Sequence, residues 1–551
     1  MTKNIKRIIV PIILGVMILA MFTLFTVSER FSNNENADLV IFGDNIDTEY
    51  KPFIQDNGVY IAVDTIYKVI DENIFYDKSA TKIIITTPTE VIKFKIDEKA
   101  MSKNMENIPT ETCAKRENDV PYVDINLLKD VYDIKIEYNE KTNTISIDKK
   151  DLEDIPIKND RVLVYADIST DSEVLEILNR NNTVTLYQDS LNHNRWFKVK
   201  TDSGIVGYIA KSNIDEMYLS NENEEPTEEE PAEENAKKYI MFWQYGSNLT
   251  TLGEEKIEGV NVVSPTWYEL KDSSGNISSE FSQSYYDQAK EYGYEIWPII
   301  TNGIDSTSYT PETTSEMLSS EKSRENFIKN LLNIAKENKL DGINIDFESM
   351  KDNDTDRDLF TQLIREMAPI FRNNGIKLSV DMYFVRYIDR TRVGEAADYV
   401  VLMGYDQRGA WSTESGSIAE ISWVEENIES LINDSKIPSS KIILGIPFYT
   451  RLWTEKEGEK SPTTKVYTMK DCQEFLLNNG LSTVLDETSG QNYAEYTQGS
   501  YTYKLWLEDQ DSIKKRVETV KKYDLAGVTA WRKGFETKET WQTIYDTLNQ
   551  E

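Results

Sequence analysis

The segment that decides the fold is residues 340–350, which read LDGINIDFESM. Side chains alternate along a β-strand, so Asn344, Asp346 and Glu348 share one face and the apolar residues between them share the other. The pattern fits a strand that turns its polar face into a barrel and its apolar face toward surrounding helices. A solvated edge strand is the alternative, but it would not need an apolar face. Because buried acids are costly unless they hydrogen-bond or react, this strand predicts a reactive site.

Strand-like and helix-like runs alternate on both sides of this segment. The apolar, β-rich runs are residues 239–246, 260–270, 294–302, 340–350, 376–384, 399–407, 442–453 and 526–536. Amphipathic stretches of helical length lie between them, as at 323–339 and 511–524. Eight strand–helix units in residues 239–551 predict an α/β fold, a (β/α)8 TIM barrel with its chemistry at the carboxyl ends of the strands. Residues 454–500 are expected to form an inserted subdomain beside that end.

Composition restricts the chemistry of this chain of 551 residues. Its 95 acidic and 61 basic residues give a net charge of −34, which repels phosphate and argues against nucleic-acid binding. One histidine, His193, and two cysteines, Cys113 and Cys472, exclude a site built from several His or Cys ligands. We expect two free thiols. Carboxylates, hydroxyls and aromatic rings must perform any chemistry, and the length suggests three or four domains.

Residues 1–30 are expected to form a cytoplasmic tip and a transmembrane anchor. Three basic residues precede residues 8–27, which carry no charge. A helix of that length spans about 30 Å, the thickness of a bilayer's hydrocarbon core, and the basic flank keeps the amino terminus in the cytoplasm. The alternative is a cleaved signal peptide, but the apolar run is long for one and no A-x-A-like site follows it. The prediction is a single-pass membrane protein whose later domains lie on the extracytoplasmic side.

Residues 35–150 contain an internal repeat with a period of about 60 residues. The copies begin at Asn57 and Asn118. Each has a short strand ending in aspartate, a short amphipathic helix and a β-branched strand, at 82–86 and 144–148. The repeat resembles the non-catalytic N-terminal domain of copper amine oxidases, which implies a spacer or a module that contacts the cell wall. It implies neither copper nor oxidation, because no His cluster accompanies it.

Residues 155–216 are expected to form a small β-barrel. Short apolar runs are separated by Asn, Asp, Ser and Gly turns. The closing pair of strands resembles bacterial SH3-like domains, which often target cell-wall peptides. Trp196 and Tyr208 either fill the barrel core or serve binding, and His193 lies in a polar turn where we expect it to be solvated. Residues 217–238 are rich in Glu and Pro and are expected to be an acidic linker.

Residues 341–348 resemble the signature of glycoside hydrolase family 18, usually written D-G-x-D-x-D-x-E. Three further segments agree with that family in order and spacing: MGYD at 403–406, GIPFY at 445–449 and GVTAW at 527–531. The resemblance covers the chain from Tyr239 to its end. One position departs from the pattern, because Asn344 stands where many members have the middle aspartate. That removes one charge beside Asp346, so proton sharing along the strand is expected to differ.

The resemblance implies catalytic roles for three side chains. Glu348 would be the general acid that protonates the glycosidic oxygen, and a nearby carboxylate favours its protonated form. Asp346 would orient the 2-acetamido group of the substrate, whose oxygen attacks the anomeric carbon to give an oxazolinium ion, and Tyr405 would hydrogen-bond that oxygen. The residues expected to bind the substrate are Asn344, Asp341, Met403, Asp406, Trp531 and Tyr383, with the ring of Trp531 as the floor under one sugar. This retaining mechanism needs no metal and no cofactor.

The implied substrate is a polysaccharide with a 2-acetamido sugar at the cleaved bond, and chitin, peptidoglycan and N-glycan cores all qualify. Residues 297–305, WPIITNGID, lack the S-x-G-G segment of many chitinases. Segments 262–270 and 445–453 resemble the spore-cortex and cell-wall branch of the family, which favours peptidoglycan and N-acetylglucosaminidase-type cleavage. With the predicted anchor, this resemblance implies a bacterial cell membrane with the catalytic domain on the cell-wall side. A chitinase and a non-catalytic glycan-binding wall protein stay as alternatives. Endo or exo action and the oligomeric state are left open.

Overall fold

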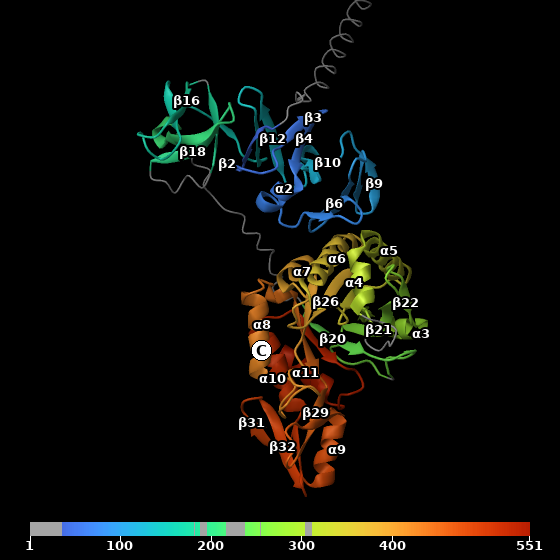
Figure 1. Cartoon of the computed structure of the whole chain (residues 1–551). Coiled ribbons are helices and arrows are strands. Elements are labelled where there is room, and N and C mark those ends of the chain that lie inside the picture. The colour runs from blue at the N-terminus through green and yellow to red at the C-terminus, as the bar shows by residue number, and fades with distance from the viewer. Residues whose placement is uncertain are drawn as a thin grey trace, which may run out of the picture. The chain divides into compact units, whose positions relative to one another are not determined.

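The computed structural model describes residues 36–180, 182–187, 195–215, 237–253, 255–303 and 311–550. They fold into two compact units, one within residues 1–230 and the other comprising residues 231–551 with the short segment 86–91 (Figure 1). The predicted anchor at 8–27 and most of the predicted linker lie outside the described residues. Within the described ranges, no helix is both long and apolar enough to cross a membrane.

Two copies of a strand–helix–strand unit build the first module of the amino-terminal unit. The first copy consists of β4 (Gly58–Ala62), α2 (Val63–Val69) and β6 (Lys82–Thr86). The second consists of β11 (Val120–Asp124), the 3-10 helix η1 (Ile125–Leu128) and β13 (Thr144–Lys149). The predicted repeat is present, but the second amphipathic helix is only a single 3-10 turn. Its two buried residues, Ile125 and Leu128, are three apart, the spacing that a 3-10 turn brings onto one side.

The strands of these copies belong to three sheets. Their orders are β12-β13-β1-β2, β10-β11-β4-β3 and β5-β6-β7-β8-β9. The additional strands are β1 (Asp38–Ile41), β2 (Asp44–Asn45), β3 (Phe53–Gln55), β5 (Phe75–Asp77), β7 (Val91–Lys95), β8 (Ala100–Lys103), β9 (Glu106–Pro109), β10 (Lys115–Glu117) and β12 (Ile134–Asn139). The copies meet where β4 and β11 pair antiparallel.

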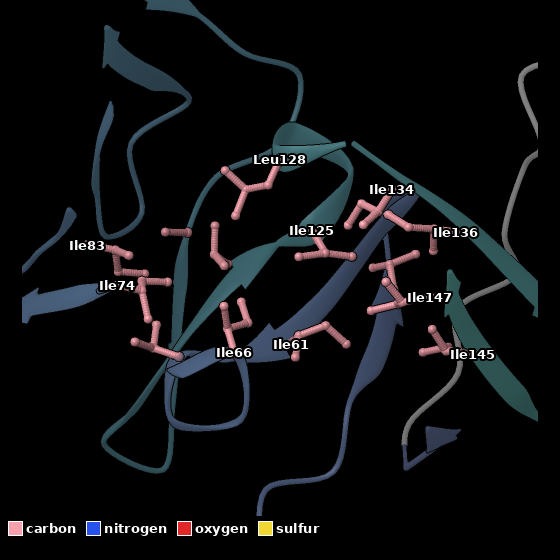
Figure 2. Packing of buried hydrophobic residues seen from close by; sticks show 14 of the residues in the cluster. Ile61, Ile66, Ile74, Ile83, Ile125, Leu128, Ile134, Ile136, Ile145 and Ile147 are labelled. Atoms are coloured by element: carbon pink, nitrogen blue, oxygen red, sulfur yellow. The ribbon is translucent and has the colours of Figure 1, made fainter. Parts of the chain in front are cut away.

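Isoleucine dominates the core of this module. Figure 2 shows side chains from both copies packed together: Ile61, Ile66, Ile74, Ile83, Ile125, Leu128, Ile134, Ile136, Ile145 and Ile147. Such β-branched side chains pack well on strands. Asp124, the N-cap of η1, is also buried, and its carboxylate accepts hydrogen bonds from the backbone N–H groups of Val59 (2.9 Å) and Asn126 (3.1 Å). One buried carboxylate therefore ties the two copies together.

The second module is an antiparallel sheet of order β14-β17-β18-β19-β15-β16. Its strands are β14 (Asp154–Pro156), β15 (Val162–Tyr165), β16 (Val174–Leu178), β17 (Thr183–Leu186), β18 (Trp196–Thr201) and β19 (Val206–Ala210), followed by the 3-10 turn η3 (Lys211–Asn213). Phe197 and Ile209 fill the core, whereas Trp196 and Tyr208 are half-buried on the opposite face. The reading in which Trp196 and Tyr208 fill the core is therefore wrong. His193 lies outside the described residues, and the resemblance to SH3-like domains stays a prediction.

A buried ion pair joins the two modules. Lys200 on β18 donates from Nζ to Asp148 on β13 (2.6 Å) and to Glu137 on β12 (2.7 Å), and the side chains of Lys200 and Asp148 are only 2% and 1% exposed. Tyr187 also donates its hydroxyl to Asp148 (2.8 Å). Burial lowers the pKa of Lys200, but the attraction and hydrogen bonds of Asp148 and Glu137 outweigh it and raise that pKa above its usual value. The two modules therefore pack as one body.

Eight parallel strands close into the predicted barrel. They are β20 (Tyr239–Gln244), β21 (Val262–Leu270), β24 (Ile299–Thr301), β25 (Gly342–Asp346), β26 (Lys377–Met382), β27 (Tyr399–Met403), β28 (Ile442–Pro447) and β34 (Gly527–Trp531). Both β21 and β34 pair with β20, which closes the ring and confirms the TIM barrel. The third run is split: β23 (Glu295–Ile296) ends before Pro298, which has no N–H to give to the ladder.

Helices cover the outside of the barrel (Figure 1). They are α3 (Gln283–Glu291), α4 (Pro311–Ser319), α5 (Glu321–Glu337), α6 (Asp354–Arg372), α7 (Arg390–Ala396), α8 (Ile421–Asn433), α10 (Gln510–Lys522) and α11 (Thr540–Asn549). The short elements β22 (Ile277–Ser279) and η5 (Ser439–Lys441) complete this part. Arg324 on α5 pairs with Glu366 on α6 at 3.0 Å, and both side chains are fully buried, so a charged contact fixes these two helices.

An inserted subdomain leaves the barrel after β28. Its elements are β29 (Tyr449–Lys456), β30 (Thr463–Thr468), α9 (Met469–Asn479), β31 (Val484–Asp486), β32 (Gln491–Gln498) and β33 (Tyr501–Trp506). Thr468 and Asp471 form a capping box at the start of α9, and Gly480, with φ 62°, ends it. The insertion begins earlier than the predicted residue 454, because β29 follows directly on the barrel strand.

Candidate active site

The polar face of β25 points into the barrel. Asn344 and Asp346 are buried, while Glu348 lies two residues beyond the end of the strand and is exposed. The intervening Ile343 and Ile345 are fully buried on the opposite face. An amide and two acids therefore rise in one column toward the carboxyl end of the strand, as the alternation of residues 340–350 predicts.

Asn344 is held at the centre of the barrel by two strong contacts. Its Oδ1 accepts a hydrogen bond from the indole Nε1 of Trp243 (2.8 Å), and its Nδ2 donates to Oδ1 of Asp381 on β26 (2.6 Å). Space for the Trp243 ring comes from Gly445 on β28, where a Cβ would lie 3.0 Å from that ring. The amide of Asn344 is thus fixed in orientation and lies below Asp346 in the column.

Asp346 is a buried acid of the site, 4% exposed. Burial raises its pKa well above the usual value, and the negative charges of Asp381 and Glu348 raise it further. Its Oδ1 is buried and finds no hydrogen-bond partner among the described residues. A buried oxygen without a partner is costly, so this atom is suited to a hydrogen bond that a ligand would supply.

Glu348 combines exposure with a raised pKa. Partial burial by the surrounding protein raises the pKa of its carboxyl, the charge of Asp406 adds to the rise, and a hydrogen bond with Tyr383 lowers it. Its backbone oxygen accepts a hydrogen bond from the hydroxyl of Tyr387 (3.3 Å). An accessible carboxyl that keeps its proton to a higher pH than usual can act as a general acid.

Aromatic rings surround the two acids. The Tyr405 ring, 4% exposed, lies edge-on to Tyr383 (centroids 6.5 Å apart), Trp243 (6.4 Å) and Tyr449 (6.1 Å). Trp531, at the end of β34, is half-buried and contacts Trp243 with ring centroids 6.0 Å apart. Rings at the ends of several strands thus form a rigid apolar wall, which can pack against the C–H faces of a sugar.

Asp406 follows β27 in a left-handed backbone conformation, with φ 58°. Its Oδ1 accepts a hydrogen bond from the Tyr449 hydroxyl (2.7 Å), and Arg451 lies 3.9 Å from the same oxygen. Burial raises the pKa of Asp406, while the Tyr449 hydrogen bond and the Arg451 charge lower it. The turn thereby aims this carboxylate at the mouth, where its charge acts on Glu348.

A groove of about 720 Å³ runs beside the mouth of the barrel. It is formed where β20, β21, β24 and β34 end, and its lining includes Tyr245, Thr266, Glu269, Thr301 and Arg532. Burial and the neighbouring Glu280 raise the pKa of Glu269. Hydroxyls, acids and rings along one groove at the carboxyl ends of the strands suit a polar polymer with many hydroxyl groups.

One of the predicted substrate-binding residues, Asp341, lies apart from the others. Asp341 lies at the start of β25, where its Oδ2 accepts hydrogen bonds from Lys290 and from the N–H of Ile296. The structure therefore does not bring Asp341 together with Asp346, Glu348 and the rings. Met403 ends β27 and is 5% exposed, two residues before Tyr405.

Two features of the site were not predicted from the sequence. Asp381 lies on β26. The sequence does hold a signal for it: an acid between apolar residues in a strand-like run, on the same face as Ser379 and Tyr383. Trp411, five residues beyond Asp406, is 68% exposed, an unusual exposure for a tryptophan, and its ring packs over Gly409. Asp381 lies on the strand next to β25, and Trp411 lies in the segment that follows β27.

Comparisons with known proteins relate two parts of the chain to known domain families. Residues 271–535 match the family model described as glycosyl hydrolases family 18, and residues 40–147 match that of the copper amine oxidase N-terminal domain. The uncharacterized glycosylase YvbX of Bacillus subtilis is 24% identical over 285 residues, which are 50% of this chain and 80% of the relative. A cortical fragment-lytic enzyme of the same organism is 23% identical over 265 residues, 46% of this chain and 59% of the relative. The C-terminal domain of a putative chitinase from Desulfitobacterium hafniense DCB-2 has the same fold, with a TM-score of 0.50 and 20% identity over 57% of this chain and 99% of that chain.

Proposed function

We propose a substrate and a mechanism for this glycoside hydrolase, whose residues 271–535 match the family model of glycosyl hydrolases family 18. It cleaves β-linked N-acetylglucosamine in a wall polysaccharide, with peptidoglycan as the favoured substrate, and it retains the anomeric configuration. The observation that carries this proposal is the pairing of two carboxyls: Asp346, buried with one unpartnered oxygen, lies beside Glu348, which is accessible and has a raised pKa.

The two carboxyls fit substrate-assisted hydrolysis. Glu348 gives its proton to the glycosidic oxygen as the bond from that oxygen to the anomeric carbon breaks. The acetamido oxygen of the same sugar attacks the anomeric carbon and forms an oxazolinium ion, so the enzyme supplies no nucleophile. Asp346 accepts the acetamido N–H and stabilises the positive charge that develops there. Glu348 then takes a proton from the water that opens the ring, which regenerates its acid form.

The rings around the acids hold the sugar for this step. Tyr405 donates its hydroxyl to the acetamido oxygen and aligns it for attack, because its ring is fixed by three aromatic neighbours. Trp531 lies under the same sugar and packs against its C–H face. The carboxylate of Asp406 accepts hydrogen bonds from sugar hydroxyls at the mouth of the barrel. Asn344 lies below Asp346, where it hydrogen-bonds Trp243 and Asp381 instead of the substrate.

Peptidoglycan is favoured over chitin by the chain as a whole. One similar protein, from Bacillus subtilis, is named a cortical fragment-lytic enzyme. The apolar run at 8–27 would anchor the chain in a bacterial membrane, with the barrel on the cell-wall side. The two modules that precede the barrel would then contact the wall and place the enzyme on its substrate. Chitin uses the same chemistry and is the alternative substrate.

Product analysis tests this proposal. The purified chain is incubated with peptidoglycan and, separately, with chitin oligomers, and new reducing ends are identified by mass spectrometry. We expect peptidoglycan fragments that end in N-acetylglucosamine. Products from chitin oligomers alone would keep the mechanism and replace the substrate, whereas no product from either would refute the proposed activity.

The charge of Asp406 is expected to set the pH range of the enzyme. Glu348 must be protonated to act, so its pKa fixes the pH above which kcat/KM falls. Asp406 raises that pKa, so Asp406→Asn lowers it and moves the alkaline limb of the kcat/KM profile to lower pH. Asp434→Asn removes the same charge after α8, at the opposite end of the barrel, and should leave the limb in place. An unmoved limb in Asp406→Asn would contradict the assignment of Glu348 as the acid.

The exposed ring of Trp411 is expected to hold the polymer beyond the cleaved bond. Trp411→Ala should raise KM for long glycan chains roughly 3- to 10-fold, the value of one sugar–ring contact of about 1 kcal/mol. The kcat for a short chitin oligomer should stay near that of the wild type, because the two acids are untouched. Initial rates on long and short substrates check this, and an equal loss on both would contradict a role limited to chain binding.

A further inference from the structure

Asp381 lies beside Asp346 on the neighbouring strand. β25 and β26 pair in parallel, with Asn344 opposite Ser379 and Ile345 opposite Val380, so the next step of the register sets Asp346 beside Asp381. The residues are 4% and 5% exposed. Two carboxyl groups thus occupy the same depth of the barrel interior, on adjacent strands.

The contacts of Asn344 distinguish the two acids. Its carbonyl oxygen accepts from Trp243, so its NH₂ group must face Asp381, to which it donates at 2.6 Å. Position 344 therefore presents a hydrogen-bond donor where many sequences with this signature have an acid. The carboxyl that this column lacks is supplied from β26 instead.

Two buried carboxyls on neighbouring positions of adjacent strands resist being ionised together, because each lacks hydration and repels the other. Burial is the largest cause that raises the pKa of each well above its usual value. Asp381 raises that of Asp346, Glu348 raises both, and the Asn344 hydrogen bond lowers that of Asp381. Tyr405, two residues beyond the end of β27, lies near the same pair and stays neutral, because burial raises its pKa well above its usual value.

We infer that Asp381 is a positioning residue that shares one proton with Asp346 and accepts it during catalysis. This inference rests on the proposed function. As the acetamido nitrogen becomes positive, the O–H bond of Asp346 breaks and an O–H bond forms on Asp381. Asp346 then faces the cation as a carboxylate, while the pair keeps one proton and one negative charge. The proton returns when water opens the oxazolinium ring.

Three variants of the full chain test the inference. Asp381→Asn keeps the size of the side chain and a hydrogen bond to position 344 but removes the second carboxyl. The double variant Asn344→Asp, Asp381→Asn exchanges the amide and the carboxyl, so that the second carboxyl stands on β25 and still has a hydrogen-bond partner on β26. Ser379→Ala is the matched control, because it removes a buried polar group from the same face of β26 without changing a charge.

The first readout needs no substrate. Infrared difference spectra follow the protonated carboxyls of the free chain as the pH is raised. In the wild type the shared proton leaves at high pH, and in Asp381→Asn this step moves to lower pH, because Asp346 has lost the charge that raised its pKa. The double variant returns it toward the wild type, and Ser379→Ala leaves it unchanged. An identical step in wild type and Asp381→Asn would overturn the inference, whatever the substrate proves to be.

The second readout is the rate on chitin oligomers. Asp381→Asn should lower kcat about 100-fold with little change in KM, which is within the range for the loss of one proton-transfer group. The double variant should have a kcat about tenfold higher than that of Asp381→Asn. Ser379→Ala should stay within about twofold of the wild type. A kcat for Asp381→Asn equal to that of the wild type would overturn the inference. A wild type that cleaves no glycan would refute the proposed function, and the infrared result would then stand by itself.

Discussion

The variant Glu348→Gln is expected to lower kcat for cleavage of an N-acetylglucosaminyl bond by roughly 10²- to 10⁴-fold, the usual contribution of a general acid. Glutamine has the same shape and keeps the contact with Tyr383, but it has no proton to give to the departing oxygen. Substrate binding should change little, because the rings and Asp346 are untouched. Initial rates of reducing-end formation on peptidoglycan and on chitin oligomers measure the loss.

Glu337→Gln serves as the control, because it removes an exposed carboxylate from the end of α5 and should not alter the rate. Activity of Glu348→Gln near that of the wild type would refute the assignment of the acid. A wild type and a variant that are equally inactive but bind glycan equally well would favour a binding protein over an enzyme.

The largest expected effect on stability comes from Lys200→Met. The substitution leaves Asp148 buried and charged, with its cation removed, and breaking a buried pair from one side costs about 3–5 kcal/mol. The free energy of unfolding of the amino-terminal unit should fall by that amount. Hydrogen exchange of peptides from β13 and β18, followed across a urea series, reports on this unit separately from the barrel.

Lys198→Met is the matched control on the same strand. Lys198 pairs with Asp44 at 2.5 Å, but those side chains are 22% and 71% exposed, so the loss should stay within about 1 kcal/mol. Equal losses in the two variants would contradict the view that the buried pair joins the two modules.

The sequence was sufficient to predict the barrel and its central strand. All eight predicted runs are strands, because a parallel barrel demands long apolar runs separated by amphipathic helices, and both signals are strong here. The face that carries Asn344, Asp346 and Glu348 followed from the period of two in strands. Asp341 does not share that alternation: it was assigned to the substrate from the resemblance alone, and it lies at the start of β25, away from the acids.

Contacts between segments distant in sequence could not be predicted in this way. Asp381 is a single acid in an apolar strand, and only the register of β26 against β25 sets it beside Asp346. The partner of Lys200 lies in another module, 52 residues away. The period of two allowed either Trp196 or Phe197 to face the core of the second module. The structure buries Phe197, which lies in the same core as Val199 and Ile209.

Cleavage of peptidoglycan before and after chemical removal of its N-acetyl groups tests the central claim most directly. If the acetamido oxygen is the nucleophile, intact peptidoglycan gives fragments with reducing N-acetylglucosamine ends, and the deacetylated polymer gives none at the sites that have lost the group. Digestion of both polymers at similar rates, with the same ends, would contradict substrate-assisted catalysis by Asp346 and Glu348.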